Sequence, residues 1–245
     1  MEMIKTKSFE LAVNAKGDEK SKKNAILLPG RLDTKDYANF VSHLEYLASK
    51  GFYAVAFDPP GTWGSPGGIE LFTTTNYLKA VNELIEYFGN KPTLLLGHSR
   101  GGNVTILAST NPHVIGIILV MSSYEAPTPP ESAKNGIQME HRDLPPGNVR
   151  TKEQKEFALP LNYFKDGKKF NPLTILREYR RPKLLFSGTD DKYYTPEEIQ
   201  EIYESIPGPK MLHEINSDHS YRRHPKIVDE VNKIIGQFLD NYIQE

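Results

Sequence analysis

The sequence predicts a single α/β domain with a mostly parallel central sheet and helices on both of its faces. Short apolar runs alternate along the chain with segments in which apolar residues recur at helical spacing. The runs lack polar alternation, which is typical of parallel strands that are covered on both faces. A length of 245 residues suits one large domain, and we expect residues 1–245 to form it.

The elements are expected in a regular strand, loop and helix order. At the start, alternation of Phe9, Leu11 and Val13 before turn residues at 14–17 predicts an antiparallel edge hairpin. Thr195 and Glu198 around Pro196 form a capping-box pattern that opens a helix. The other strands are expected at 24–28, 52–57, 93–96, 114–121, 183–186 and 211–215. The helices are expected at 34–50, 76–88, 100–109, 195–205 and from Pro225 onward.

Residues 122–181 interrupt this order with many prolines and charges between weak helical patterns. Such a segment is too short and too polar to bury a core of its own, so we interpret it as a cap or lid insertion. Tyr124, Tyr163 and Phe164 are its candidate substrate-lining residues. The alternative is that these aromatic side chains pack the insertion onto the domain.

Composition excludes several classes of function. Lys and Arg number 30 against 31 for Asp and Glu, so no charge excess is available to attract nucleic acid or anionic membrane. The absence of cysteine excludes a thiol nucleophile and thiolate metal sites. No apolar stretch approaches the roughly 18 residues of a membrane span. We expect a cytoplasmic protein that acts on a small molecule; the oligomeric state does not follow from the sequence.

Gly97-His98-Ser99-Arg100-Gly101 is the strongest catalytic motif in the chain. It directly follows the expected strand at 93–96 and precedes a helix, which is the context of a nucleophile elbow. A serine on so sharp a turn has strained backbone angles, and side chains in place of the two glycines would collide with neighbouring elements. The alternative is a chance match on an ordinary turn. Ser99 is therefore the candidate nucleophile.

A serine nucleophile requires a base, and the base requires an acid that orients it. Of the seven histidines, His219 follows the last expected strand directly, at the edge where ligands of parallel sheets bind. The others lie within expected helices or strands, in the insertion, beside the serine or near the last helix. Asp190 and Asp191 follow the preceding strand and are both candidates for the acid.

These motifs, in this order, resemble those of the α/β-hydrolase superfamily, in particular its esterase, lipase and serine-aminopeptidase-like branch. The resemblance extends from Asn24 to Tyr242 and implies the α/β-hydrolase fold. In that family the acid commonly stands in a Gly-x-x-Asp pattern, which Gly188 and Asp191 satisfy. The resemblance thus favours Asp191 and leaves Asp190 as a turn or capping residue.

Two further stretches carry the resemblance. Residues 58–65, Asp-Pro-Pro-Gly-Thr-Trp-Gly-Ser, are similar to a family loop of the form Asp-x-x-Gly-x-Gly-x-Ser. Leu28-Pro29-Gly30-Arg31 stands where the family usually has His-Gly-x, with proline in place of histidine. The resemblance implies an oxyanion hole formed by the backbone N–H groups of Arg31 and Arg100. Their side chains either hold an anionic substrate or pair with nearby acids.

The combined prediction is a serine hydrolase that cleaves a carboxylic ester of a small or medium acyl group through an acyl-enzyme. Ser99 is the nucleophile, His219 the general base and Asp191 the orienting acid. No metal and no organic cofactor is required. Thioesterase and peptidase or amidase activities use the same triad and remain alternatives, as do perhydrolase and carbon–carbon hydrolase chemistry. A non-catalytic binding member of the fold is the alternative from another class.

Overall fold

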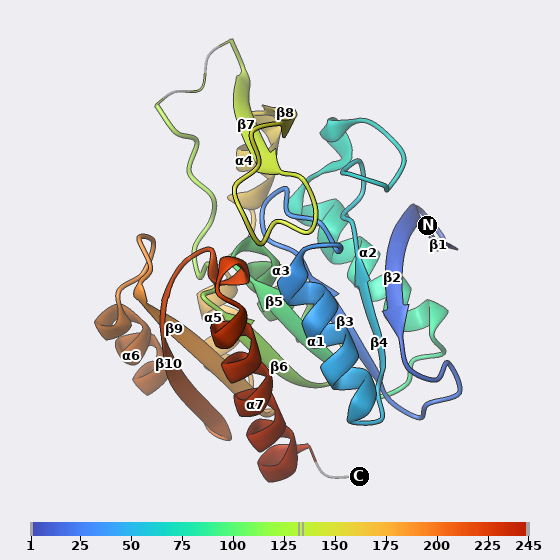
Figure 1. Ribbon diagram of the computed structural model, residues 1–245, viewed down its shortest axis with the longest axis vertical. Coiled ribbons are helices and arrows are strands. Elements are labelled where there is room, and N and C mark those ends of the chain that lie inside the picture. Colours follow the sequence, from blue (N-terminus) through green and yellow to red (C-terminus); the bar gives the residue numbers. More distant parts are fainter. Residues whose placement is uncertain (1, 132, 134, 244–245) are drawn as a thin grey trace.

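A computed structural model describes residues 2–131, 133 and 135–243. Its main sheet has eight strands in the order β1-β2-β4-β3-β5-β6-β9-β10 (Figure 1). Only β1 and β2 join it by antiparallel pairing; the remaining strands pair in parallel. The strands are β1 (Glu2–Lys5), β2 (Glu10–Lys16), β3 (Asn24–Leu28), β4 (Tyr53–Phe57), β5 (Thr93–His98), β6 (Val114–Val120), β9 (Lys183–Asp190) and β10 (Lys210–Asp218).

Helices cover both faces of this sheet, as the sequence predicts. On one face α1 and α7 lie side by side (Figure 1), and their apolar side chains pack with alternate strand residues such as Leu27. On the other face α2, α3, α5 and α6 pack with the intervening residues, such as Ile26. The helices are α1 (Ala38–Ser49), α2 (Thr74–Tyr87), α3 (Arg100–Ala108), α4 (Asn162–Gly167), α5 (Pro172–Glu178), α6 (Pro196–Ser205) and α7 (Pro225–Tyr242). The predicted fold class is confirmed.

Local signals placed some boundaries well and others wrongly: the helix predicted from residue 34 begins at Ala38, and the strand predicted to end at 186 continues to Asp190. The capping box of α6 is present: Thr195 Oγ1 accepts from the Glu198 amide, and the Glu198 carboxylate accepts from the Thr195 amide. Of the turn predicted at 14–17 only Gly17 lies outside a strand, and the turn of the antiparallel hairpin lies between β1 and β2 at 6–9. Residues up to Lys16 stay extended because β2 pairs antiparallel with β4, as far as the Lys16 and Ala54 partners. Long-range strand pairing thus overrides the local turn signal.

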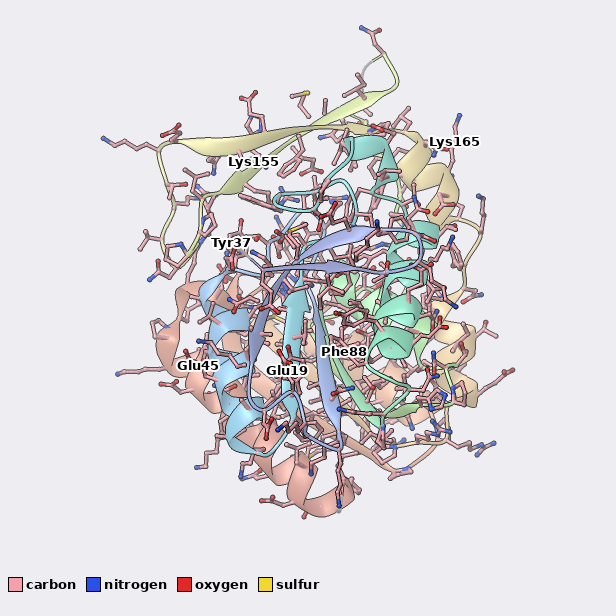
Figure 2. The ribbon with its side chains drawn as sticks, turned by 90° about the vertical axis from the view of Figure 1, so that its right-hand side faces the viewer. Glu19, Tyr37, Glu45, Phe88, Lys155 and Lys165 are labelled. Carbon is pink, nitrogen blue, oxygen red and sulfur yellow. The ribbon has the colours of Figure 1, made fainter. Side chains whose placement is uncertain are left out.

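The segment between β6 and β9 contains a two-stranded antiparallel hairpin that the sequence analysis missed. It consists of β7 (Ile137–Asp143) and β8 (Gln154–Pro160), separate from the main sheet. Figure 2 shows the hairpin, with Lys155 on β8, lying across the end of the molecule above Tyr37. The Tyr37 hydroxyl donates to the Asp143 carbonyl at 2.8 Å, and this bond attaches the hairpin to the loop that leads into α1. The interpretation of 122–181 as a cap within one domain stays a prediction.

None of the helices formed by the described residues combines the length and hydrophobicity that a bilayer crossing requires.

Candidate active site

Ser99 lies on a sharp turn between β5, which ends at His98, and α3, which begins at Arg100. Its backbone angles are φ 52° and ψ −120°, a conformation that costs a non-glycine residue on the order of 1–3 kcal/mol. A Cβ on Gly101 would overlap the Leu28 carbonyl. A Cβ on Gly97 would lie 2.5 Å from the Gly101 carbonyl oxygen. The steric need for both glycines is therefore confirmed.

The structure brings Ser99, His219 and Asp191 together in a hydrogen-bonded chain. His219 Nε2 lies 2.8 Å from Ser99 Oγ, and His219 Nδ1 lies 2.9 Å from Asp191 Oδ2. Asp191 follows the last residue of β9, and His219 follows the last residue of β10. Asp190, the other predicted candidate, is exposed and contacts the Thr189 hydroxyl. Of the two aspartates, Asp191 is therefore the one that contacts His219.

The charge state of His219 suits a proton acceptor. Burial lowers the pKa of His219 below its ordinary value of 6.5, and the hydrogen bond and charge of Asp191 oppose this shift in part. Because a carboxylate only accepts hydrogen bonds, Nδ1 carries the proton that faces Asp191. The Nε2 lone pair of the neutral ring then faces Ser99 Oγ, where it can accept the serine proton.

The loop after β3 lies directly against Ser99. A Cβ on Gly30 would lie 3.3 Å from Ser99 Cβ, so the backbone of this loop comes close to the reacting hydroxyl. Arg100 is the first residue of α3, and its amide has no acceptor inside the helix. Within the described part of the chain, neither the Arg31 amide nor the Arg100 amide has a hydrogen-bond partner. Arg31, Arg100 and Ser99 line one cavity.

The conformation of this loop is held by contacts from two other segments. Leu32 has a positive φ of 61°. Arg142, on β7, donates two hydrogen bonds to the Arg31 carbonyl, from Nε at 3.0 Å and from Nη2 at 2.9 Å. Trp63, in the loop that carries Asp58, donates from Nε1 to the Leu32 carbonyl at 2.8 Å. Side chains remote in sequence therefore hold two consecutive peptides, Arg31–Leu32 and Leu32–Asp33.

The side chains of Arg31 and Arg100 have partners within the protein. Arg31 Nη2 lies 3.2 Å from Glu140 Oε1 on β7. The buried Arg100 guanidinium donates to Thr74 Oγ1 at 2.7 Å and to the Glu125 carbonyl at 3.2 Å. Of the two roles considered from the sequence, pairing within the protein fits these contacts better than anion binding.

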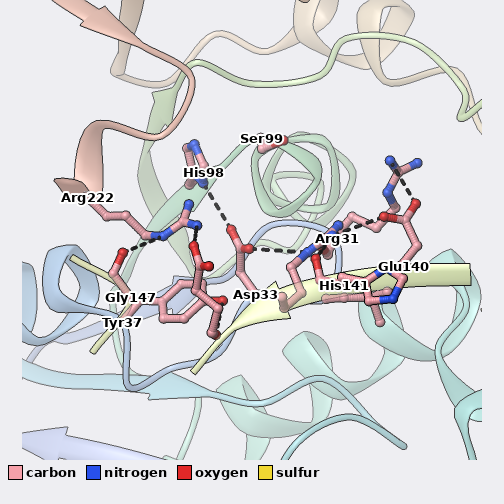
Figure 3. A network of polar contacts seen from close by, with 12 residues as sticks. Arg31, Asp33, Tyr37, His98, Ser99, Glu140, His141, Gly147 and Arg222 are labelled. Carbon is pink, nitrogen blue, oxygen red and sulfur yellow. Dashed lines mark hydrogen bonds and ion pairs between the residues drawn. The ribbon is translucent and has the colours of Figure 1, made fainter. Parts of the chain in front are cut away.

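A buried pair, His98 and Asp33, lies next to the triad and was missed by sequence reasoning (Figure 3). His98 Nε2 donates to the His219 carbonyl at 3.0 Å, and His98 Nδ1 lies 3.5 Å from Asp33 Oδ2. Burial disfavours the Asp33 carboxylate, but its contact with His98 and the charges of Arg222, His98 and Arg142 lower its pKa to about 2. Asp33 lies between the strand predicted at 24–28 and the helix predicted at 34–50, so no local pattern identified it.

The cavity above Ser99 has a volume of about 590 Å³. Of the three aromatic residues that were predicted to line it, one does and two do not. Tyr163 lies on the lining, whereas Tyr124 and Phe164 pack in the main core and do not reach it. Because burial of large apolar rings is favourable, Tyr124 and Phe164 pack in the core and do not line the cavity.

Aromatic lining comes instead from the loop between β9 and α6. Tyr193 and Tyr194 both line the cavity, and the Tyr193 ring lies 4.5 Å from the His219 ring between centroids. The signal that could have found them is their position two and three residues after Asp191, at the carboxyl end of a parallel strand. Within residues 2–131, 133 and 135–243, no group of three or more His, Asp or Glu side chains is arranged to hold a metal ion.

The fold and the arrangement of these side chains define an α/β hydrolase. The model of the alpha/beta hydrolase family matches residues 25–231, and the chain belongs to that family. A curated relative, the mitochondrial palmitoyl-protein thioesterase ABHD10 of Rattus norvegicus, is 25% identical over 164 residues. The match includes 66% of this chain and 52% of the relative, so the chain spans about half the length of that protein.

Solved structures extend the similarity in fold to the full chain. Est1E from Butyrivibrio proteoclasticus, solved with ferulic acid bound, superposes with a TM-score of 0.78 at 16% identity and complete coverage of both chains. The Pyrococcus furiosus esterase Pf2001 superposes with a TM-score of 0.71 at 18% identity, covering 99% of this chain and 92% of its own. At these identities the likeness concerns the fold alone.

Proposed function

We propose that this chain hydrolyses carboxylic esters of small or medium acyl groups through an acyl-enzyme on Ser99. The observation that carries the proposal is the chain of contacts from Ser99 Oγ to His219 at 2.8 Å and from His219 to Asp191 at 2.9 Å. This is the geometry that general-base activation of a serine requires. The family to which the chain belongs supports a hydrolytic reaction.

In the proposed mechanism His219 Nε2 takes the proton of Ser99 as its oxygen attacks the acyl carbonyl. The amides of Arg31 and Arg100 donate to the resulting oxyanion, and Asp191 stabilises the imidazolium of His219. His219 then protonates the leaving oxygen, and the acyl-enzyme forms as the ester bond breaks. A water molecule, deprotonated by His219, releases the acid and restores Ser99.

A thioester substrate is a second candidate because the curated rat relative is called a palmitoyl-protein thioesterase. Thioesters pass through the same tetrahedral intermediate and use the same triad. The leaving thiolate needs less proton donation than an alkoxide does, because the pKa of a thiol is near 8.5. A cavity of about 590 Å³ is of the size that holds small organic ligands.

The first experiment measures hydrolysis of p-nitrophenyl esters from acetyl to long acyl, and of matched acyl thioesters. The wild type and Ser99→Ala are assayed in parallel. We expect the variant to lose more than about a thousandfold in kcat. The acyl chain length at which the wild type is most active indicates the length of the acyl site. The ratio of thioester to ester rates distinguishes the two candidate functions.

Labelling with a fluorophosphonate is the complementary measurement, since it requires an activated serine but no particular substrate. We expect labelling of the wild type and none of Ser99→Ala. A folded wild-type protein that neither reacts with the probe nor cleaves any ester or thioester would contradict the proposal and favour a non-catalytic binding role.

A further inference from the structure

Basic side chains dominate the charged lining of the cavity above Ser99. They come from the loop after β3, from α3, from the β7–β8 hairpin, from the end of β9 and from the short helix η2 (Tyr221–Arg223). The cationic residues on the lining are Arg31, Arg100, Arg142, Arg150, Lys192, Arg222 and Arg223. The carboxylates on the lining are Asp33, Glu125, Asp143 and Glu198. Cations therefore outnumber carboxylates.

Most of these guanidinium groups are occupied by partners within the protein. Those of Arg31, Arg100 and Arg142 have the contacts described above. Arg222 donates from Nε to the Gly147 carbonyl at 3.1 Å, a contact visible in Figure 3, and from Nη2 to Asp143 at 3.2 Å. Each of these four side chains therefore has at least one partner within the protein, although Arg100 Nε has none among the described residues.

Arg223 and Arg150 lie at the same end of the cavity, beside Asp143. Arg223 Nη2 contacts Asp143 Oδ2 at 2.7 Å, so one carboxylate is shared with the Arg222 guanidinium. Arg223 Nε is buried and, like Arg100 Nε, has no hydrogen-bond partner among the described residues. The Thr151 amide donates to Asp143 Oδ1 at 3.3 Å, which brings its neighbour Arg150 to this end. Arg150 is exposed and has no acid partner in the described part of the chain.

A short segment of chain joins this end of the cavity to His219. Arg223 is the last residue of η2, which begins two residues after His219. In the proposed mechanism His219 must reach the leaving atom to protonate it, so the leaving group lies toward His219. The other three carboxylates of the lining, Asp33, Glu125 and Glu198, come from the loop after β3, from the segment after β6 and from α6.

We propose that Arg223 and Arg150 bind a carboxylate or phosphate on the leaving-group portion of the substrate. Arginine is suited to this role because its planar donors pair with two oxygens of one anion. The inference rests on the proposed ester or thioester hydrolysis and narrows it to substrates with an anionic leaving group.

The test compares esters that differ only in one carboxylate. On the leaving-group side, p-nitrophenyl butyrate is compared with the butyrate of p-nitrophenol that carries a carboxyl group ortho to the nitro group. On the acyl side, p-nitrophenyl hexanoate is compared with the p-nitrophenyl monoester of adipic acid. Each kcat/KM is divided by the rate constant for hydrolysis of the same ester by hydroxide. This ratio corrects the comparison for differences in the intrinsic reactivity of the esters.

We expect the wild type to prefer the carboxylated leaving group by about tenfold, with no such preference on the acyl side. Arg150→Gln and Arg223→Gln should each reduce this preference at least threefold. The preference is a ratio measured on one preparation, so partial misfolding of a variant does not alter it. Replacing the carboxylate by a phosphate on the same phenol distinguishes the two anions.

Lys192→Gln is the matched control, because it removes from the same cavity a positive charge that has no acid partner among the described residues, two residues after β9 ends. We expect it to leave the preference unchanged. The proposal is overturned if the wild type has no preference, if the preference lies on the acyl side, or if the control lowers it as much as the two arginine variants do. Absence of Ser99-dependent hydrolysis of the neutral esters and of the matched thioesters would instead overturn the proposed function.

Discussion

At the residue scale, burial and the Asp191 carboxylate have opposite effects on the pKa of His219. Burial favours its neutral form, while the Asp191 carboxylate favours the charged form. The net pKa lies below 6.5, so the ring is neutral and able to accept a proton at neutral pH. Its other neighbour, His98, fixes the His219 backbone through a hydrogen bond to the carbonyl.

The first prediction concerns the pH profile of the proposed reaction. The acid limb of kcat/KM should have its midpoint below 6.5, because activity requires neutral His219. Asp191→Asn removes the hydrogen bond and charge that raise the pKa of His219, so the midpoint should move to lower pH while kcat falls about a thousandfold or more. Ester hydrolysis between pH 4 and 9 measures both effects.

Asp190→Asn is the matched control for this prediction, because Asp190 is the exposed neighbour and does not contact His219. Its pH profile and kcat should equal those of the wild type. If Asp190→Asn, and not Asp191→Asn, impaired activity, the acid would be assigned wrongly.

At the element scale, the β7–β8 hairpin is attached to the loop that lies against Ser99. Arg142 links its strand β7 to the Arg31 carbonyl, and Glu140 on the same strand contacts both Arg142 and Arg31. Figure 3 shows Glu140 beside Arg31. Each peptide group is planar, so the direction of a backbone N–H or carbonyl is set by the orientation of its peptide plane. A side chain that holds the carbonyl of a loop residue therefore also restricts the orientation of the neighbouring peptide.

We predict that Arg142→Lys lowers kcat about tenfold with a smaller change in KM. Lysine keeps the charge but has no planar fork to donate two hydrogen bonds to one carbonyl, so the Arg31 amide loses its fixed direction. Steady-state kinetics on the best ester of the panel tests this. His141→Gln, at the adjacent exposed position of β7, should retain wild-type kcat.

A uniform rise in KM at constant kcat in Arg142→Lys would contradict this role and indicate substrate binding instead. The melting temperature of both variants should stay within a few degrees of the wild type, since the hairpin lies outside the main sheet.

At the scale of the whole molecule, buried carboxylates join separate parts of the chain. Asp33 connects the loop after β3 with His98 and Arg142, and Asp143 connects the hairpin with η2. Burial disfavours both charges, but their partners outweigh it and lower the pKa of each to about 2. Asp58 behaves in the opposite way, since burial raises its pKa above 3.8.

These shifts predict a loss of stability in acid. A depressed carboxylate pKa contributes stability that is complete above the unfolded value near 3.8 and is lost as pH falls toward 2. Asp33 and Asp143 should each contribute up to about 2 kcal/mol, which Asp58 offsets in part. Urea unfolding at pH 7, 4 and 3 should show a clear fall between the last two values.

Asp143→Asn tests which groups are responsible. The variant should be less stable at pH 7, because two guanidinium groups lose a charged partner, but its stability should fall less steeply between pH 4 and 3. Equal slopes for wild type and variant would mean that Asp143 is not among the groups that titrate.

The order of elements and the candidate triad could be predicted because each depends on local pattern. Apolar runs identify buried strands, and Gly97 and Gly101 identify a turn on which no other residue fits. Ser99, Asp191 and His219 each stand a few residues after a strand that the sequence predicts, and directly after the strand that the structure has there. In a parallel sheet the carboxyl ends of the strands share one edge, so strand order along the chain suffices to bring them near one another.

What only the tertiary structure decided is which residues meet when they are distant in sequence. The partners of Arg31 and the excess of positive charge around Asp143 depend on where the hairpin lies. The contact of Asp33 with His98 depends on how the loop after β3 folds back over β5. The strands of that hairpin are polar and largely exposed, so they lack the apolar pattern that identifies buried strands. The sequence by itself determined the fold class and the candidate triad, because burial and sharp turns impose local patterns, whereas polar contacts between distant segments impose none.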